Sequence, residues 1–150
     1  MNFYHIHHLK NPWKKYNISI SKKSILYVAG WLNNRDITSL KKAYEEGSTS
    51  LEKWLSKQNG HFAFIIVEKD IIFLATDKVS SFPLFFCDYN KYEIEISSSS
   101  STWIDKDFAN DISKENLEIY QMAGYTIGRT TIRKSVKRIL PGELCTILSN

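Results

Sequence analysis

The sequence has little cysteine: its 150 residues include only Cys87 and Cys145. Two thiols are too few for the disulfide framework that stabilises many small secreted domains. Neither belongs to a C-x-x-C pair of the kind found in metal or redox motifs. We therefore expect both cysteines to be reduced and to serve as small structural side chains.

Long apolar runs are also missing. No stretch approaches the roughly 20 apolar residues that a transmembrane helix needs. The first residues, Met1 to His5, lack the charged segment followed by an apolar segment that marks a secretory signal. These two absences favour a cytoplasmic location and predict no association with a membrane.

The charge of the sequence excludes few function classes, and it does not predict binding to a nucleic acid. The formal net charge is +4, which is mild and implies no polyanionic partner. The most basic group lies near the C-terminus and comprises Arg129, Arg133, Lys134, Lys137 and Arg138. Because no exposed aromatics are interleaved with it and no known module surrounds it, we expect a solvated face. A docking surface for a partner domain is the alternative.

A metal centre is not expected. His5, His7 and His8 lie close together, and His5 and His7 would share one face of a strand. No aspartate, glutamate or cysteine follows at ligand spacing. We therefore expect a solvated strand end without a metal, and we expect Trp13 and Trp31 to pack in the core or at an interface.

Hydrophobic periodicity predicts one domain of strands and helices in separate blocks. A helix ending near Ala123 is expected to be capped by Ser113 and stopped by Gly124, with Leu117 and Tyr120 facing inward. Strands are expected at 3–8, 24–29, 61–68, 71–76, 84–87, 92–96 and 144–148, and helices at 38–46, 50–57 and 113–123. The five serines at 97–101 are expected to form a structured turn. Segregated blocks of this kind indicate an α+β fold.

Four stretches in order resemble the class II glutamine amidotransferase domain of glutamine-dependent asparagine synthetases. Residues 60–64 (G-H-F-A-F) resemble the family's G-M-F-A-F strand, and residues 76–86 resemble its R-D-x-x-G-x-x-P-L-Y-Y segment. Ser97-Ser98 lies where the family has F-A-S-E. Residues 124–132 followed by 139–142 resemble G-Y-x-x-G-x-x-T-x-F and L-P-P-G.

The resemblance implies the fold of N-terminal-nucleophile hydrolases, a four-layer αββα sandwich of two antiparallel sheets flanked by helices. Residues 1–150 would form a single degenerate amidotransferase domain, and the synthetase domain that follows in the family, with its S-G-G-x-D-S loop, is absent from this chain. ATP and magnesium would belong to that partner domain, acting in cis or in trans in asparagine biosynthesis. No cofactor is expected in this domain. The sequence does not decide whether the chain forms a homo-oligomer.

The family's chemistry requires groups that this sequence lacks. In the family, an N-terminal cysteine attacks the glutamine amide with its own amine as base, whereas Met1 and Asn2 offer no nucleophile. Ala29 occupies the place of the oxyanion-hole asparagine, and Gly30 alone keeps its place. The substrate-binding arginine of an R-G-P-D stretch is missing, because the nearest arginine, Arg35, follows the strand instead of preceding it.

We therefore expect no catalytic residue and only a vestige of the glutamine pocket. Residues 28–34 resemble the family's V-N-G-E-I-Y-N. Asp36 falls near the family's substrate-binding aspartate, but the sequence fits a helix N-cap at Asp36 equally well. In 76–86, Thr76 and Ser80 replace arginine and glycine while Asp77 is kept. The vestigial pocket would comprise Ala29, Gly30, Asn34, Asp36 and Asp77.

Three functions follow from this pattern. The first is an inactive glutaminase-like domain that acts as a scaffold for an asparagine-synthetase-like, ATP-dependent amide-forming domain. The second is an active amidotransferase whose N-terminus has been misassigned, although Ala29 and the missing arginine speak against it. The third is a stand-alone binding module without a catalytic partner.

Overall fold

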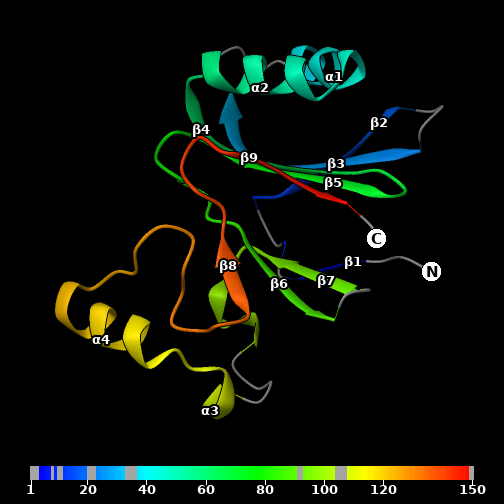
Figure 1. Cartoon of the computed structure of the whole chain (residues 1–150). Helices are drawn as coiled ribbons and strands as arrows, with labels where there is room; N and C mark the ends of the chain where they lie inside the picture. The colour runs from blue at the N-terminus through cyan, green and yellow to red at the C-terminus, as the bar shows by residue number, and fades with distance from the viewer. Residues whose placement is uncertain are drawn as a thin grey trace. The chain divides into compact units, whose positions relative to one another are not determined.

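The chain forms two compact units in a computed structural model (Figure 1). The structure describes residues 4–7, 9, 12–19, 23–32, 37–90, 93–103 and 108–148. Unit 1 comprises Met1–Leu9, Pro83–Leu140 and Asn150, and unit 2 comprises Lys10–Phe82 and Pro141–Ser149. Each unit contains one sheet and its own helices, so the predicted α+β class is confirmed.

Unit 2 is built on a five-stranded antiparallel sheet. Its strands, in spatial order, are β2 (Lys14–Ser19), β3 (Ser24–Leu32), β4 (Gly60–Val67), β5 (Ile71–Thr76) and β9 (Leu144–Leu148). The hairpin predicted at 61–76 forms its centre, since β4 and β5 pair from Ala63 with Thr76 to Val67 with Ile72. Nearly every residue of these two strands is buried, as expected for strands with apolar side chains on both faces.

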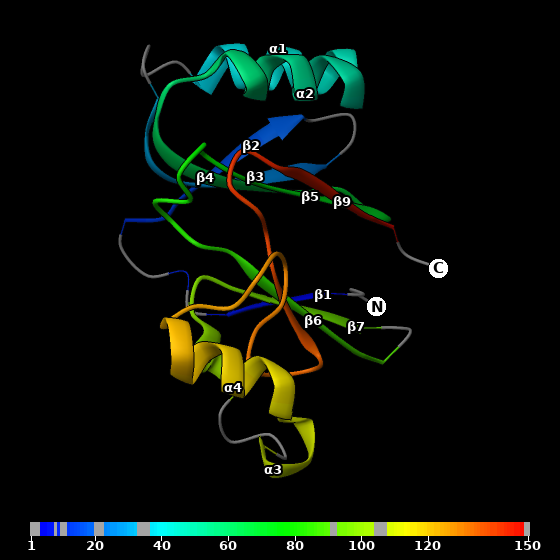
Figure 2. The same cartoon turned by 60° about the vertical axis from the view of Figure 1, so that its left-hand side comes forward.

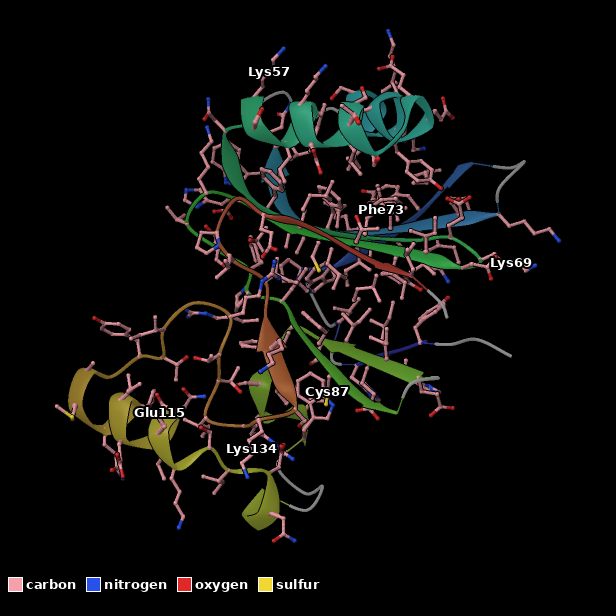
Figure 3. The ribbon with its side chains drawn as sticks, viewed as in Figure 1. Lys57, Lys69, Phe73, Cys87, Glu115 and Lys134 are labelled. Atoms are coloured by element: carbon pink, nitrogen blue, oxygen red, sulfur yellow. The ribbon has the colours of Figure 1, made fainter. Side chains whose placement is uncertain are left out.

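Two helices cover one face of this sheet, α1 (Ile37–Glu46) and α2 (Ser48–Lys57), which lie side by side in both views (Figures 1 and 2). Their apolar stripes enter one core with alternate residues of the strands. Fully buried members include Leu26, Leu40, Leu51, Phe64 and Ile66. The side chain of Phe73 points from β5 into this layer (Figure 3), where its ring meets that of Tyr44 edge-on at 6.1 Å.

Unit 1 contains a four-stranded mixed sheet. Its strands, in spatial order, are β1 (Tyr4–His7), β7 (Glu93–Ser97), β6 (Phe85–Asn90) and β8 (Val136–Arg138). β1 runs parallel to β7, pairing Tyr4 with Ile94 and His7 with Ser97, while the other pairs are antiparallel. The prediction of purely antiparallel sheets missed this pair, because partners so far apart in sequence leave no local sign of direction.

Buried polar contacts accompany the apolar packing of unit 1. One small buried cluster consists of Cys87, Trp103 and Val136, and Figure 3 marks Cys87 on β6; Leu84, Ile96 and Ile139 are buried as well. Arg133 is 3% exposed and donates from Nε to Asp111 Oδ2 at 2.7 Å, with a further bond to the Trp103 carbonyl. The short helices η1 (Ser100–Trp103) and α3 (Phe108–Asp111) carry these partners.

Helix α4 (Lys114–Ala123) begins and ends as predicted. Ser113 accepts a hydrogen bond from the Asn116 backbone, and Gly124 closes the helix at φ 76° in the left-handed region. However, no residue of α4 is buried, and Tyr120 is 49% exposed. The prediction that Tyr120 faces inward was therefore wrong.

Several predictions on single residues were also tested. Cys87 and Cys145 are both free, as expected. The serine run is structured, with Ser97 buried at the end of β7 and its hydroxyl 2.5 Å from that of Thr102. Trp31, by contrast, is 54% exposed and lies outside the core. Among the described residues, no helix is long and apolar enough to cross a membrane.

Candidate functional site at one end of the unit 2 sheet

Three of the predicted pocket residues meet at one end of the sheet in unit 2. Ala29 on β3 pairs with Ala63 on β4, which in turn pairs with Thr76 at the end of β5. One step along, Gly30 pairs with Phe62. The Phe62 backbone nitrogen donates to Asp77 Oδ2 at 3.0 Å. Ala29, Gly30 and Asp77 therefore form one neighbourhood although the sequence separates them by almost 50 residues.

The remaining predicted site positions are not placed by the structure. Met1 and Asn2, where the catalytic nucleophile was sought, lie outside the described residues, as do Asn34, Arg35 and Asp36. The site is accordingly built here from β3, β4, β5 and the turn after β5.

Ala29 contributes no polar group to this neighbourhood. Its side chain is 1% exposed and lies in the middle of the β3–β4 ladder. A methyl group neither donates nor accepts a hydrogen bond, so it stabilises no developing oxyanion. Whatever donors this end of the sheet offers to a ligand must come from the backbone or from other side chains.

Gly30 is required here by packing alone. Its φ is 81°, a conformation that side chains rarely adopt. A Cβ at this position would lie 1.9 Å from the His61 carbonyl oxygen and 2.4 Å from Cε2 of Phe82. The strand backbone and a ring thus fill the space that any side chain would occupy. The presence of glycine is therefore explained without any role in catalysis.

The Asp77 carboxylate serves as an acceptor for the backbone. It is 3% exposed, and it accepts from the backbone nitrogens of Phe62, Val79 and Ser81 at 3.0, 2.8 and 3.1 Å. Burial by itself raises the pKa of this carboxyl group, but the hydrogen bonds outweigh it and hold the pKa below the ordinary value. Asp77 is therefore an ionised side chain whose acceptors are already in use.

The Asp77 main chain ties three segments together. Its nitrogen donates to the Phe62 carbonyl at 2.9 Å. Its carbonyl accepts from Ser80 at 3.0 Å and from Gly142, at the turn before β9, at 2.8 Å. Ser80, which replaces a glycine of the resembled motif, has a positive φ of 54°. Asp77 thus acts as a structural joint between these segments.

Sequence reasoning missed a polar pair beside these residues. His61 Nδ1 lies 2.6 Å from Ser81 Oγ, and both side chains are exposed. The ring of Trp31 lies beside that of His61, with centroids 5.6 Å apart. The signal was present in residues 60–64, where histidine stands in place of the methionine of G-M-F-A-F.

A cavity is found among the described residues of each unit. That of unit 2 has a volume of about 350 Å³ and is lined by Lys14, Tyr16, Val28, Gly30, Trp31, Leu32 and Ile37. That of unit 1, about 330 Å³, is lined by Phe85, Ser100, Ser101, Tyr120, Thr126, Thr131, Ile132, Arg133 and Val136. The first reaches Gly30 but contains no carboxylate, imidazole or thiol among its lining residues. The titratable side chains that it offers are those of Lys14 and Tyr16 on β2.

Comparison with known proteins identifies a family over most of the chain. Residues 16–150 match the family described as the glutamine amidotransferase domain. The chain belongs to this family. The match covers both sheets except β1 and the start of β2, and it includes Ala29, Gly30 and Asp77.

Similarity to individual proteins is weaker. No curated protein matches the amidotransferase domain. Among solved structures, it is similar to the glutamine phosphoribosylpyrophosphate amidotransferase from B. subtilis, in a complex with ADP and GMP. The identity is 15% and the TM-score 0.42, and the match covers 91% of this chain and 31% of that protein. The chain thus spans about a third of the length of the amidotransferase it matches.

Two of the clustered histidines, His5 and His7, are placed by the structure in unit 1. His5 and His7 lie on β1 with ring centroids 6.3 Å apart. His7 Nε2 is 3.8 Å from Glu95 Oε2, a carboxylate that also accepts from the indole of Trp103. Among the described residues of the amidotransferase domain, no group of three or more His, Cys, Asp or Glu side chains is placed to hold a metal ion. His8 lies outside these residues.

The basic group near the C-terminus is not one surface. Arg129 and Lys134 are exposed, whereas Arg133 is buried in its pair with Asp111. Arg138 donates to the carbonyls of Gly128 and Thr126 at 2.6 and 3.0 Å, and so holds the loop between α4 and β8. The prediction of a solvated basic face was therefore wrong for Arg133, because its charge is used inside unit 1.

Proposed function

We propose that this amidotransferase domain no longer hydrolyses glutamine and acts as a scaffold for an asparagine-synthetase-like domain. That partner would bind ATP and magnesium and form an amide, in cis or in trans. The observation that carries the proposal is the contrast at the end of the unit 2 sheet. Groups that pack are kept, and groups that would contact glutamine are replaced.

Two neighbouring positions, the retained Gly30 and the replaced residue at Ala29, both support the loss of glutaminase activity. Gly30 keeps its place because the His61 carbonyl and Phe82 leave no room for a side chain. Ala29, whose side chain is 1% exposed, stands where the resembled family has the oxyanion-hole asparagine, so the side-chain amide is missing. Removal of one donor from an oxyanion hole costs about 2.7–4 kcal/mol of transition-state stabilisation. The retained glycine is thus no sign of retained chemistry.

Neither cysteine supplies the missing thiol. Cys87 is fully buried on β6 beside Trp103 and Val136. Cys145 lies within β9, where it pairs with Leu74 of β5. A mid-strand thiol carries no free amine, so it lacks the base on which the family's nucleophile depends.

An apolar surface of unit 1 supports the scaffold role. Tyr120 and Met122 on α4 are 49% and 89% exposed, and Tyr125 and Ile127 in the following loop are 63% and 65% exposed. Large apolar side chains exposed this close together in sequence, at the end of α4 and in the loop after it, are typical of an interaction site. We assign this α4 patch to the synthetase-like partner.

The test uses the complex of the chain with an asparagine-synthetase-type domain that co-purifies with it from its own cells. Amide formation is measured with ATP, magnesium and either ammonium or glutamine as the nitrogen source. We expect product with ammonium and none above the blank with glutamine. Replacing Met122 and Ile127 by serine should weaken the complex without unfolding the chain, since both side chains are exposed. Product from glutamine would refute inactivity, and failure of any such domain to bind would refute the scaffold role.

A further inference from the structure

His61 and Ser81 form a hydrogen-bonded pair in which the imidazole can act as a base toward the hydroxyl group in the tautomer that leaves Nδ1 without a proton. His61 Nδ1 and Ser81 Oγ are 2.6 Å apart, within the range expected when a base takes a proton from a hydroxyl group. His61 lies near the start of β4, and Ser81 lies in the turn that follows β5. Both side chains are open to solvent, so a small molecule can reach them.

The backbone that carries Ser81 is fixed. Its nitrogen donates to Asp77 Oδ2 at 3.1 Å, and the preceding Ser80 donates to the Asp77 carbonyl at 3.0 Å. The next residue, Phe82, places its ring over Gly30. A nucleophile held in this way needs little reorganisation before reaction, which is a general requirement of an efficient site.

We propose that Ser81, activated by His61, is a nucleophile toward small carboxylic esters. A serine hydroxyl is unreactive alone and is activated by an adjacent base. The ring of Trp31, 54% exposed and beside His61, offers an apolar plane for the acyl group. Sequence comparison assigns no role to these residues, and the activity is separate from the scaffold role.

The step requires only water as a second reactant. Ser81 Oγ forms a bond to the ester carbonyl carbon while its proton passes to His61 Nδ1. The tetrahedral adduct then breaks its bond to the alcohol oxygen, which leaves with that proton. Water, deprotonated by the same nitrogen, attacks the acyl-serine and releases the carboxylic acid, so both residues return to their starting forms.

Turnover is expected to be slow and the acyl-serine long-lived. Within the described ranges, no carboxylate hydrogen-bonds the His61 ring, so no third group orients the base as in a full triad. Ala29 also supplies no donor at this end of the sheet. Covalent capture is therefore a more sensitive measure of the site than steady-state hydrolysis.

The experiment treats the full chain with an alkyl fluorophosphonate and, separately, with p-nitrophenyl acetate. Intact mass spectrometry counts the adducts, and peptide mapping locates them. We expect one adduct on Ser81. It should be absent in Ser81→Ala and should form at least about 100-fold more slowly in His61→Ala, which loses the general base.

A matched control is Ser56→Ala. Ser56 is also exposed, but its hydroxyl donates to the Lys53 carbonyl and has no imidazole partner. This variant should label like the wild type. An unlabelled wild-type protein, or labelling of Ser81 that is unaffected by His61→Ala, would overturn the proposal. Circular dichroism confirms that each variant is folded.

The same variants separate this proposal from the loss of glutaminase activity. If the wild type releases glutamate from glutamine and Ser81→Ala does not, the nucleophile is confirmed and the proposed inactivity is refuted. If only esters and phosphonates react, both proposals are supported.

Discussion

The interiors of the two units differ in how much buried polar structure accompanies the apolar packing. Unit 2 encloses a continuous apolar core between its sheet and helices α1 and α2, with Leu40, Leu51 and Phe64 at 0% exposure. Unit 1 buries fewer apolar side chains among its described residues, including Leu84, Ile96 and Trp103, and adds the buried Arg133 with its bond to Asp111 and several side chain–backbone contacts. Its longest helix buries no residue at all.

This contrast explains why ligand-binding side chains can be replaced in unit 2 without loss of the fold. In unit 2, apolar burial and the hydrogen bonds of Asp77 maintain the sheet end around Gly30, so side chains there that would contact only a ligand can be replaced at little cost. In unit 1, buried polar side chains such as Arg133 and Thr131 supplement the apolar packing. Substitutions should therefore separate the units by the type of residue to which each is sensitive.

The largest effect is expected from Phe64→Ala in unit 2. Phe64 is fully buried, and its ring lies 6.0 Å from that of Trp54. Removing the ring leaves a cavity in the core, so we expect the free energy of unfolding to fall by about 4 kcal/mol. Urea denaturation measures it. Tyr120→Ala on the exposed face of α4 is the control and should cost less than about 1 kcal/mol. Equal costs would contradict the contrast.

Arg133→Met should be the most damaging polar substitution in unit 1. The change leaves Asp111 without the guanidinium that lies 2.7 Å from its oxygen, so we expect a loss of about 3 kcal/mol. A double-mutant cycle with Asp111→Ala measures the coupling between the two side chains. We expect at least about 1 kcal/mol of coupling, and additive effects would show that the pair is incidental.

Acid should weaken unit 2 through Asp77. Because the pKa of Asp77 is lowered by folding, its stabilisation is complete above the unfolded pKa of about 3.9 and is lost as the pH falls through the folded pKa. Asp77→Asn leaves buried backbone donors unsatisfied, so it should cost about 1–3 kcal/mol at pH 7. Its stability should also change less than that of the wild type between pH 5 and 3. Urea titrations across this range test both effects, and parallel pH profiles would contradict the assignment.

The smallest effect is expected from the helix caps. Ser113→Ala removes the hydroxyl that caps α4, and should cost about 1 kcal/mol and speed amide exchange in the helix. Helix α2 has Gly47 at its N-cap and no side-chain cap, but its core residues hold it. Ser48→Ala should therefore change little, and a larger effect there than in α4 would reverse the comparison.

The sequence predicted the fold of unit 2 better than that of unit 1. Alternating and continuous apolar runs located β3, β4, β5 and β9, and the stripe of Leu51, Trp54 and Leu55 located α2. Strands β2 and β8 and helix α3 were missed. β2 is rich in lysine, tyrosine and asparagine, and β8 is only three residues long. Such segments become strands by pairing with distant neighbours, which periodicity does not reveal.

The glutamine pocket expected from the sequence stays a prediction. Motif order grouped Ala29, Gly30 and Asp77, and the structure places these three near one another, but only Gly30 lines the cavity of unit 2. The role of Asp77 as a backbone joint depends on Phe62 and Gly142, which contact it only after folding. The His61–Ser81 pair depends on strand register, since 20 residues separate the two side chains.

The central claim is that the sheet end around Gly30 is maintained by packing and no longer serves glutamine hydrolysis. Glutamate release from saturating glutamine, followed by mass spectrometry with the purified chain, tests it most directly. We predict a rate equal to that of the buffer blank. Sustained release that scales with the concentration of the chain would contradict the claim.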